Sequence, residues 1–296
     1  MNNNNDEDTI ADGIVRVLLY NGCSGSSATF KLSQQILDAH GFKSWKGKSE
    51  LDKPKNNPFY YEARKKVYDS GAWRPTSDDF VIEALKLLNN HVQHIKKKIL
   101  FTKQFYDRAH LFSIDSAYAA MYRRNKLDVA ICFVKDCFKV NKKTGMSTLG
   151  YSLFANNNTK TDKGVCFTRR NNDNLVLKVH LETDKLIEFL VERVDEEEER
   201  IQKFKALISP AKEQYYEDLF AFTYSSNYGI FKKSIQAWCT LLRAITAYID
   251  EDVVKDVLLP IKNTRKPPPS HKEIIENFEE VKNALKKAKL ARFLRK

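Results

Sequence analysis

An apolar, β-branched run near the start of the chain is the feature that most limits its possible folds. Residues 14–20 read Ile-Val-Arg-Val-Leu-Leu-Tyr, which is typical of a buried strand. A loop of small residues follows, and the sequence then predicts a helix over about 29–40. Buried strands that alternate with helices form sheets covered on both faces. This segment therefore predicts an α/β fold.

The rest of the chain continues the alternation of helices and strands. We predict helices over about 78–90, 109–120, 125–140, 183–205, 211–223, 230–248 and 271–289. We predict strands at 99–102, 121–123 and 175–181. The expected fold is α/β, a P-loop-like three-layer arrangement with a central, mainly parallel sheet flanked by helices. Ligands are then expected at the carboxyl ends of the strands.

The domain organisation is predicted from composition along the chain. Residues 1–13 form a polar, acidic lead that we expect to be disordered. Residues 14–296 are expected to form one domain, in which the Asn-, Lys- and Thr-rich stretch at about 141–174 is a long surface excursion. We expect the irregular stretches 41–58 and 141–174 to be loops, and a binding site for a substrate is expected to form there.

The charge and cysteine content narrow the class of protein. A net charge of +12 attracts polyanions, but its basic and aromatic residues match no nucleic-acid-binding motif, so we expect no nucleic-acid partner. No apolar stretch approaches about 20 residues, so we expect no membrane span. The polar start predicts no secretory signal, and five scattered cysteines predict neither a disulfide scaffold nor a zinc site. We therefore expect a cytoplasmic protein.

The loop after the first predicted strand is a candidate anion site. Small residues let backbone N–H groups close around an anion, and the following helix adds its positive end. The loop has neither the Gly-Lys-Ser/Thr of a Walker A motif nor a G-x-G-x-x-G fingerprint, and an ordinary turn is the alternative. The candidate binding residues are Cys23, Ser24, Gly25, Ser26, Ser27, Ala28 and Thr29.

A second candidate anion site lies at Met121–Cys132. A short apolar run ends on Arg123 and Arg124, and a helix is predicted to begin after Asn125, its N-cap. The helix carries an apolar stripe at Leu127, Ala130, Ile131, Val134 and Phe138. Two guanidinium groups beside free helical N–H groups indicate a phosphate site; the alternative is a turn with solvated arginines.

These two elements resemble those of sulfotransferases that use 3′-phosphoadenosine 5′-phosphosulfate (PAPS). Arg124-Asn125-x-x-Asp128-x-x-x-Cys132 resembles the family's 3′-phosphate element, and Ser24-Gly25-Ser26-Ser27 resembles its 5′-phosphosulfate loop. The resemblance is closer to the bacterial glycolipid and carbohydrate-type and protein-tyrosine-type branches than to the cytosolic phenol enzymes. Two departures are plain: Cys23 stands where the family has a basic residue, and Cys132 stands where it has serine.

The C-terminal half adds two weaker similarities. Gln214-Tyr215-Tyr216-Glu217-Asp218-Leu219 resembles the family's Tyr-Glu-Asp-Leu strand end. Arg265-Lys266, followed by a helix through residues 275–281, resembles its closing basic loop and final helix. The matching pieces span nearly the whole chain, and their order and spacing carry the resemblance.

The resemblance implies transfer of a sulfuryl group from PAPS to a hydroxyl of a carbohydrate or other small molecule. The product nucleotide is 3′-phosphoadenosine 5′-phosphate (PAP), and no metal is needed. The resemblance implies that loop N–H groups of Gly25, Ser26 and Ser27 hold the 5′-phosphosulfate. It also implies that Arg124 and Cys132, helped by Arg265 or Lys266, hold the 3′-phosphate. Arg123 is expected to face solvent or to pair with a carboxylate.

Two residues are candidates for the chemistry. Glu50 matches the region where some branches place a catalytic glutamate, and its alternative is an exposed loop carboxylate. Lys103, from a predicted strand, is expected to contact the leaving oxygen, and its alternative is a solvated edge lysine. Lys103 or Lys31 would supply the charge missing at Cys23.

Two other functions remain open. One is a protein of the sulfotransferase fold that has lost catalysis and binds a nucleotide or another anion, because the two cysteine departures weaken the motifs. The other is an ATP-dependent phosphotransferase, which the missing Walker lysine disfavours. The sequence does not identify the acceptor or the oligomeric state.

Overall fold

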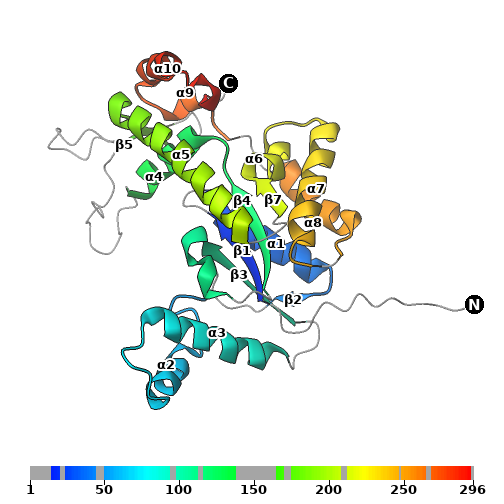
Figure 1. Cartoon of the computed structure of the whole chain (residues 1–296). Coiled ribbons are helices and arrows are strands. Elements are labelled where there is room, and N and C mark those ends of the chain that lie inside the picture. Colours follow the sequence, from blue (N-terminus) through cyan, green and yellow to red (C-terminus); the bar gives the residue numbers. More distant parts are fainter. Residues whose placement is uncertain are drawn as a thin grey trace, which may run out of the picture. The chain divides into compact units, whose positions relative to one another are not determined.

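The computed structural model describes residues 15–20, 24–44, 50–93, 98–112, 116–137, 165–169, 175–207, 212–246, 248–264 and 268–294. A sheet of five parallel strands forms the centre of the fold (Figure 1). From one edge to the other its strands are β2 (Lys43–Ser44), β3 (Lys98–Phe105), β1 (Val15–Tyr20), β4 (Ala117–Tyr122) and β7 (Lys212–Tyr215). The predicted α/β fold with a parallel sheet flanked by helices is confirmed.

Strand β1 lies in the middle of the sheet and pairs with both β3 and β4. All six of its residues are buried, as expected for a central strand. Its last residue, Tyr20, is level with Phe105 of β3 and Met121 of β4. The strand that follows β1 in the chain, β2, lies at one edge of the sheet, whereas β7, which comes after β4, lies at the other edge. Such a change of direction between neighbouring strands marks the usual ligand position in parallel α/β sheets.

The contacts divide the chain into two compact units. The first contains residues 1–122 and 204–266, and the second contains residues 123–203 and 267–296. The single domain expected over 14–296 remains a prediction. In the first unit the helices are α1 (Ser26–Ala39), α2 (Tyr60–Asp69), α3 (Ser77–Gln93), η1 (Tyr106–Leu111), α6 (Tyr216–Leu219), η2 (Ala221–Thr223), α7 (Tyr228–Arg243) and α8 (Glu251–Thr264).

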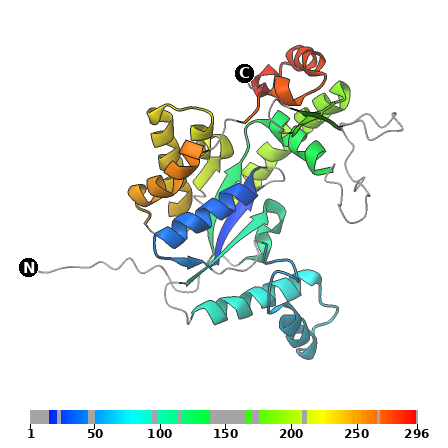
Figure 2. The ribbon, with the colours of Figure 1, turned by 180° about the vertical axis from the view of Figure 1, so that it is seen from behind.

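Helix α1 runs along one face of the sheet and packs against β1 and β3 (Figure 2). Helices α7 and α8 pack on each other, and α8 also contacts α1. Aromatic rings fill the core beneath them: Phe30 stacks on Phe101 with ring centres 4.7 Å apart. Trp238 is fully buried, and its Nε1 donates to the Leu219 carbonyl at 2.9 Å. Because the indole N–H finds a partner, its burial costs little.

The second unit has a separate core. It contains α4 (Lys126–Cys137), most of α5 (Thr183–Leu207), α9 (His271–Ile274), α10 (Phe278–Lys287), η3 (Ala291–Phe293) and an antiparallel pair, β5 (Val165–Arg169) and β6 (Leu175–Val179). Leu127, Ala130 and Ile131 pack with apolar residues of α5 and α10, which confirms this part of the predicted stripe. The side chains of Val134 and Phe138 lie outside the described residues.

Several sequence predictions were wrong in their element type. The predicted helix at 109–120 is replaced by the end of η1 and by β4, because residues 117–121 pair with β1. The predicted helix at 211–223 begins as strand β7, which pairs with β4. Helices α2 and α8 were not predicted, and the closing helix is divided into α9 and α10.

Some predictions fall on parts of the chain that the structure does not describe. The lead at 1–13 and most of the excursion at 141–174 lie outside the described residues. Strand β5 is the described part of that excursion, and it pairs with β6. The predicted strand at 175–181 is confirmed as β6, which ends at Val179.

Helix α1 begins at Gly25, which has a backbone conformation that favours glycine. Its φ is 84°, and a Cβ at this position would lie 2.4 Å from Cδ2 and Cε2 of the Tyr216 ring. Gly71, between α2 and α3, also has a positive φ of 75°, but a Cβ there would meet nothing within 4 Å. Substitution of both glycines by alanine would introduce the same backbone strain, but only the substitution at Gly25 would also introduce a steric clash.

We predict that Gly25→Ala destabilises the protein more than Gly71→Ala does. The left-handed backbone costs each alanine about 1 kcal/mol, and overpacking against Tyr216 adds at least about 1 kcal/mol for Gly25→Ala. Urea unfolding of the two variants and the wild type measures the difference. Equal losses of unfolding free energy would contradict the close packing of Tyr216 on Gly25.

Candidate functional site

Four polar side chains converge at the carboxyl ends of β1 and β3. Lys103 Nζ, from β3, donates to Ser27 Oγ in the first turn of α1 at 3.0 Å. The same Nζ lies 3.7 Å from Glu50 Oε1 and 4.9 Å from the centre of the Tyr20 ring. Tyr20, the last residue of β1, donates its hydroxyl to Glu50 Oε1 at 2.7 Å. Three predicted site residues, Ser27, Glu50 and Lys103, therefore lie together.

The ammonium of Lys103 is largely removed from water. The residue is 7% exposed, so it is not a solvated edge lysine. Burial lowers the pKa of Lys103, and the nearby Glu50 carboxylate opposes this by favouring the charged form. A cation in such surroundings interacts more strongly with an anion than a solvated lysine does.

Glu50 is held by donors from three directions. Besides Tyr20 and Lys103, it forms an ion pair with Lys53, and its side chain is 17% exposed. Burial raises the pKa of Glu50, but hydrogen bonds from Lys53 and Tyr20 and the charges of Lys53 and Lys103 outweigh burial, so the pKa is lowered. Glu50 is therefore ionised at neutral pH, and it is not an exposed loop carboxylate.

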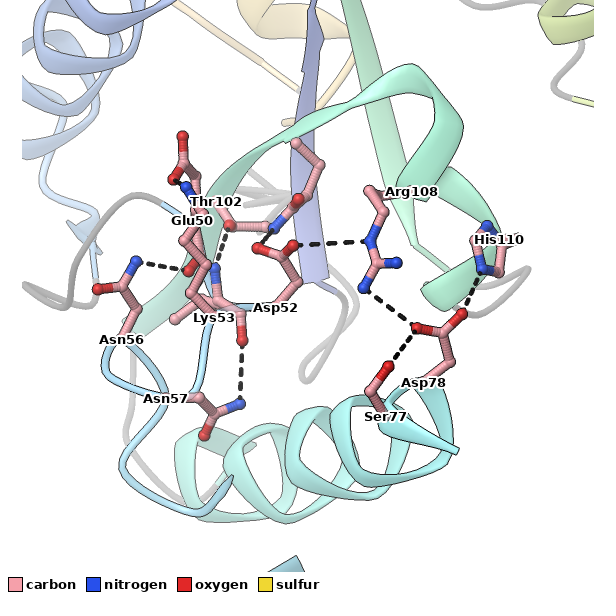
Figure 3. Close-up of polar contacts among 12 residues, drawn as sticks. Glu50, Asp52, Lys53, Asn56, Asn57, Ser77, Asp78, Thr102, Arg108 and His110 are labelled. Carbon is pink, nitrogen blue, oxygen red and sulfur yellow. Dashed lines mark hydrogen bonds and ion pairs between the residues drawn. The ribbon is translucent and has the colours of Figure 1, made fainter. Parts of the chain in front are cut away.

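The segment that carries Glu50 is tied to β3 by hydrogen bonds (Figure 3). The Leu51 N–H donates to Thr102 Oγ1 at 3.3 Å, and Gln104 Nε2 donates to Asp52 Oδ1 at 2.8 Å. Asn56 Nδ2 donates to the Glu50 carbonyl at 2.7 Å. These bonds hold the backbone that follows Glu50, and its carboxylate lies 3.7 Å from Lys103 Nζ.

A charged network continues from this segment to the start of α3. In Figure 3, Arg108 reaches from Asp52 towards Asp78, with its Nε 3.7 Å from Asp52 Oδ2 and its Nη2 3.1 Å from Asp78 Oδ1. His110 Nε2 lies 3.1 Å from the other oxygen of Asp78. The sequence analysis did not identify this network, because its members are joined only by tertiary contacts.

The predicted anion loop surrounds the start of α1. Ser24, Ser26 and Thr29 are buried, whereas Ser27 and Ala28 are exposed. The first N–H groups of a helix have no acceptor within it, so this end attracts an anion. The Ser24 hydroxyl is buried and makes no hydrogen bond in the structure. Cys23 lies outside the described residues.

The predicted 3′-phosphate element belongs to the second unit, where Arg124 is exposed just before α4 and Cys132 is half-buried two turns into it. Asn125 Oδ1 accepts from the Asp128 N–H at 3.1 Å, which confirms the predicted N-cap. Arg123 Nη2 lies 3.0 Å from Asp128 Oδ2, which confirms the predicted carboxylate partner. Arg265 and Lys266 lie outside the described residues.

A buried histidine completes the surroundings of Asp128. His271, the first residue of α9, is fully buried, and its Nε2 lies 2.8 Å from Asp128 Oδ1. Asp128 therefore uses one oxygen for Arg123 and the other for His271. The sequence analysis did not identify His271, because 143 residues separate the partners and no local motif connects them.

No family model, curated protein or solved structure matches this chain. Within the described part of the chain, none of the helices combines the length and apolar composition needed to cross a bilayer. Among the same residues, no group of three or more histidine, cysteine or acidic side chains is placed to hold a metal ion.

We predict that Glu50 contributes stability that depends on pH. Because its folded-state pKa is lowered, the contribution is present above the ordinary value of 4.5 and is lost as the pH falls through the lowered value. The wild type should therefore be more stable than Glu50→Gln at neutral pH, and the gap should close in acid. Urea unfolding from about pH 7 to about pH 3 measures this gap. Glu62→Gln, at an exposed position on α2, is the control; a gap that stays constant with pH would contradict the prediction.

We predict that His271→Ala destabilises the second unit by roughly 2–4 kcal/mol, because it removes a buried partner of Asp128 and leaves a cavity. Glu279→Gln, which breaks an exposed ion pair with Lys282, should cause no measurable change. Hydrogen exchange of the α4 amides and thermal unfolding report the effect. Unchanged protection of α4 in His271→Ala would refute the role of this contact.

Proposed function

We propose that the chain is a PAPS-dependent sulfotransferase that acts on a hydroxyl of a carbohydrate or other small molecule. In this reaction the acceptor oxygen attacks sulfur in line, and a new oxygen–sulfur bond forms. The bond between sulfur and the 5′-phosphate oxygen breaks, and PAP leaves with the electron pair. The enzyme must align the reactants, balance charge on the leaving oxygen and take up the acceptor proton.

The observation that carries the proposal is the contact of Lys103 with Ser27. It brings a buried cation to the start of α1, where helical N–H groups already favour an anion. Lys103 therefore supplies the charge that the resemblance requires and that Cys23 lacks. Lys31, the other candidate, is exposed on α1. In the proposed reaction, Lys103 stabilises negative charge on the leaving oxygen.

Glu50 is the proposed proton acceptor. It is ionised at neutral pH, and it lies beside Lys103, so a hydroxyl bound between them would be close to both. Its lowered pKa makes it a weak base while Tyr20 and Lys53 donate to it. An acceptor hydroxyl that displaced Lys53 would raise the pKa of Glu50 and make it a stronger base, because the ammonium charge that favours the carboxylate would be lost.

In this proposal Arg124 and Cys132 bind the 3′-phosphate. Arginine gives a charge-assisted, often bidentate hydrogen bond to phosphate, whereas a thiol is a weak donor. Most of the selectivity for a 3′-phosphate is therefore assigned to Arg124. The two alternative functions differ in what they predict: a protein that has lost catalysis binds PAP without turnover, and a phosphotransferase binds ATP with Mg²⁺.

The decisive experiment is calorimetric titration with PAP, AMP and ATP, each with and without Mg²⁺. We expect selective, Mg²⁺-independent binding of PAP. Arg124→Ala should weaken PAP binding by about tenfold or more while AMP binding changes little, because only PAP carries the 3′-phosphate. Lys103→Gln should weaken both nucleotides, because both carry the 5′-phosphate.

Lys31→Gln is the matched control, because it removes a lysine of α1 that is exposed. Its PAP affinity should equal that of the wild type. A preference of the wild type for Mg²⁺-ATP would refute the proposed function. Equal losses of PAP and AMP binding in Arg124→Ala would refute the role of Arg124 alone.

A further inference from the structure

Helix α2 presents an outward face of aromatic and basic side chains. Tyr61, Arg64, Lys65 and Tyr68 recur at helical spacing and are all exposed, with Tyr61 72% exposed. The opposite side of the helix packs on α3, where Tyr60 contacts Phe80. Figures 1 and 2 both show α2 on the side of α3 that is remote from the sheet. Two members of the outward face, Tyr68 and Arg64, also reach Phe80 of α3, at 5.4 Å between ring centres and 5.8 Å from the guanidinium to the ring centre. Part of this face therefore packs on α3, while its side chains stay exposed to solvent.

The turn after α2 extends this surface. Trp73 is 87% exposed, more than any other large hydrophobic residue that the structure describes. Arg74 follows it with a positive φ of 52°, which is strained for a residue with a side chain, and its guanidinium lies 5.6 Å from the Trp73 ring centre. Arg64 likewise lies 5.8 Å from the Tyr68 ring centre. Each cation is held beside an aromatic ring.

The net charge of this region indicates that a ligand bound here would be negatively charged. Residues 53–74 contain six lysines and arginines and two carboxylates, Glu62 and Asp69, so the net charge is +4. Lys66 is paired with Glu83, but the α2 face, defined as Tyr61, Arg64, Lys65, Tyr68, Trp73 and Arg74, contains no acidic residue. An exposed surface rich in tryptophan, tyrosine and arginine is typical of a binding surface.

We propose that the α2 face binds an acidic oligosaccharide, a chain of sugars that carry carboxylates. Flat aromatic rings offer apolar surfaces for the C–H faces of sugar rings, while guanidinium groups bind carboxylates with two hydrogen bonds. This inference rests on the proposed function and narrows its acceptor to an acidic glycan.

The connection between the α2 face and Glu50 fits an acceptor that binds along this region. Residues 50–57 lead directly from Glu50 to α2, and Asn56 and Asn57 bond back to the carbonyls of Glu50 and Leu51 at 2.7 and 3.4 Å. These bonds hold the segment together, and those of Leu51 and Asp52 with Thr102 and Gln104 hold it on β3. A glycan bound on the α2 face is held by the same unit that contains the proposed proton acceptor.

A membrane surface fits the α2 face less well than a glycan does. Helices that lie in a membrane interface present several tryptophan, phenylalanine or leucine side chains along one face. Of these residue types the α2 face has only Trp73, which lies in the turn after the helix, and the apolar Ala63 of α2 is buried. A nucleic acid would also meet rings and cations, so it is included in the test as a competing ligand.

The test is direct binding of two acidic octasaccharides, one from polygalacturonate and one from hyaluronan, to the full chain without nucleotide. We expect Trp73→Ala and Arg64→Ala each to weaken binding by about fivefold or more. Tyr228→Ala and Lys255→Ala, at exposed positions on α7 and α8, should leave it unchanged. The carboxyl-reduced galacturonate chain should bind much more weakly than its parent.

Three results would overturn the α2 face as a glycan site. They are failure of both octasaccharides to bind, equal affinity in Trp73→Ala and the wild type, and tighter binding of a single-stranded DNA of equal charge. PAP titration of the same samples distinguishes failure of the glycan site from failure of the proposed sulfotransferase function. Loss of glycan binding with unchanged PAP affinity in Trp73→Ala supports the α2 face, whereas failure of the wild type to bind PAP counts only against the sulfotransferase activity.

Discussion

The parallel pairing of β1 with both β3 and β4 is the constraint on which the candidate site depends. Parallel strands end at the same edge of a sheet, so Tyr20 at the end of β1 lies level with Phe105 at the end of β3. This pairing brings Tyr20 and Lys103 to within cation–π distance and aligns Lys103 with the first turn of α1. Because β1 is buried on both faces, its register cannot shift without exposing apolar side chains.

The buried ammonium of Lys103 sets the electrostatics of this edge. Its removal from water is offset by Ser27, Glu50 and the Tyr20 ring, and each of these contacts comes from a different part of the chain. Burial raises the pKa of Glu50, but hydrogen bonds from Lys53 and the Tyr20 hydroxyl, with the charges of Lys53 and Lys103, lower it overall. An anion placed beside Lys103 would favour its charged form, as Glu50 already does.

Sequence reasoning succeeded where the signal was local. The strand at 15–20, the helix after it, the N-cap Asn125 and the apolar positions of α4 all follow from patterns within about 12 residues. It failed at residues 117–120 and at Lys212–Tyr215, where pairing with a neighbouring strand overrode weak helical patterns. It also missed His271 and the network around Arg108, whose contacts join residues far apart in the chain.

The sequence by itself determined the α/β class and the order of most elements, because hydrophobic periodicity and helix capping act over short stretches of chain. It also predicted two candidate anion-binding segments from their small or basic residues before a helix. It also identified Glu50, Lys103 and Ser27 as separate candidates, each with an ordinary alternative. Only the tertiary structure decided that these three lie together and that Asp128 is shared between Arg123 and His271. The physical reason is that strand order and register are set by the summed burial of the whole sheet, which no short stretch of sequence contains.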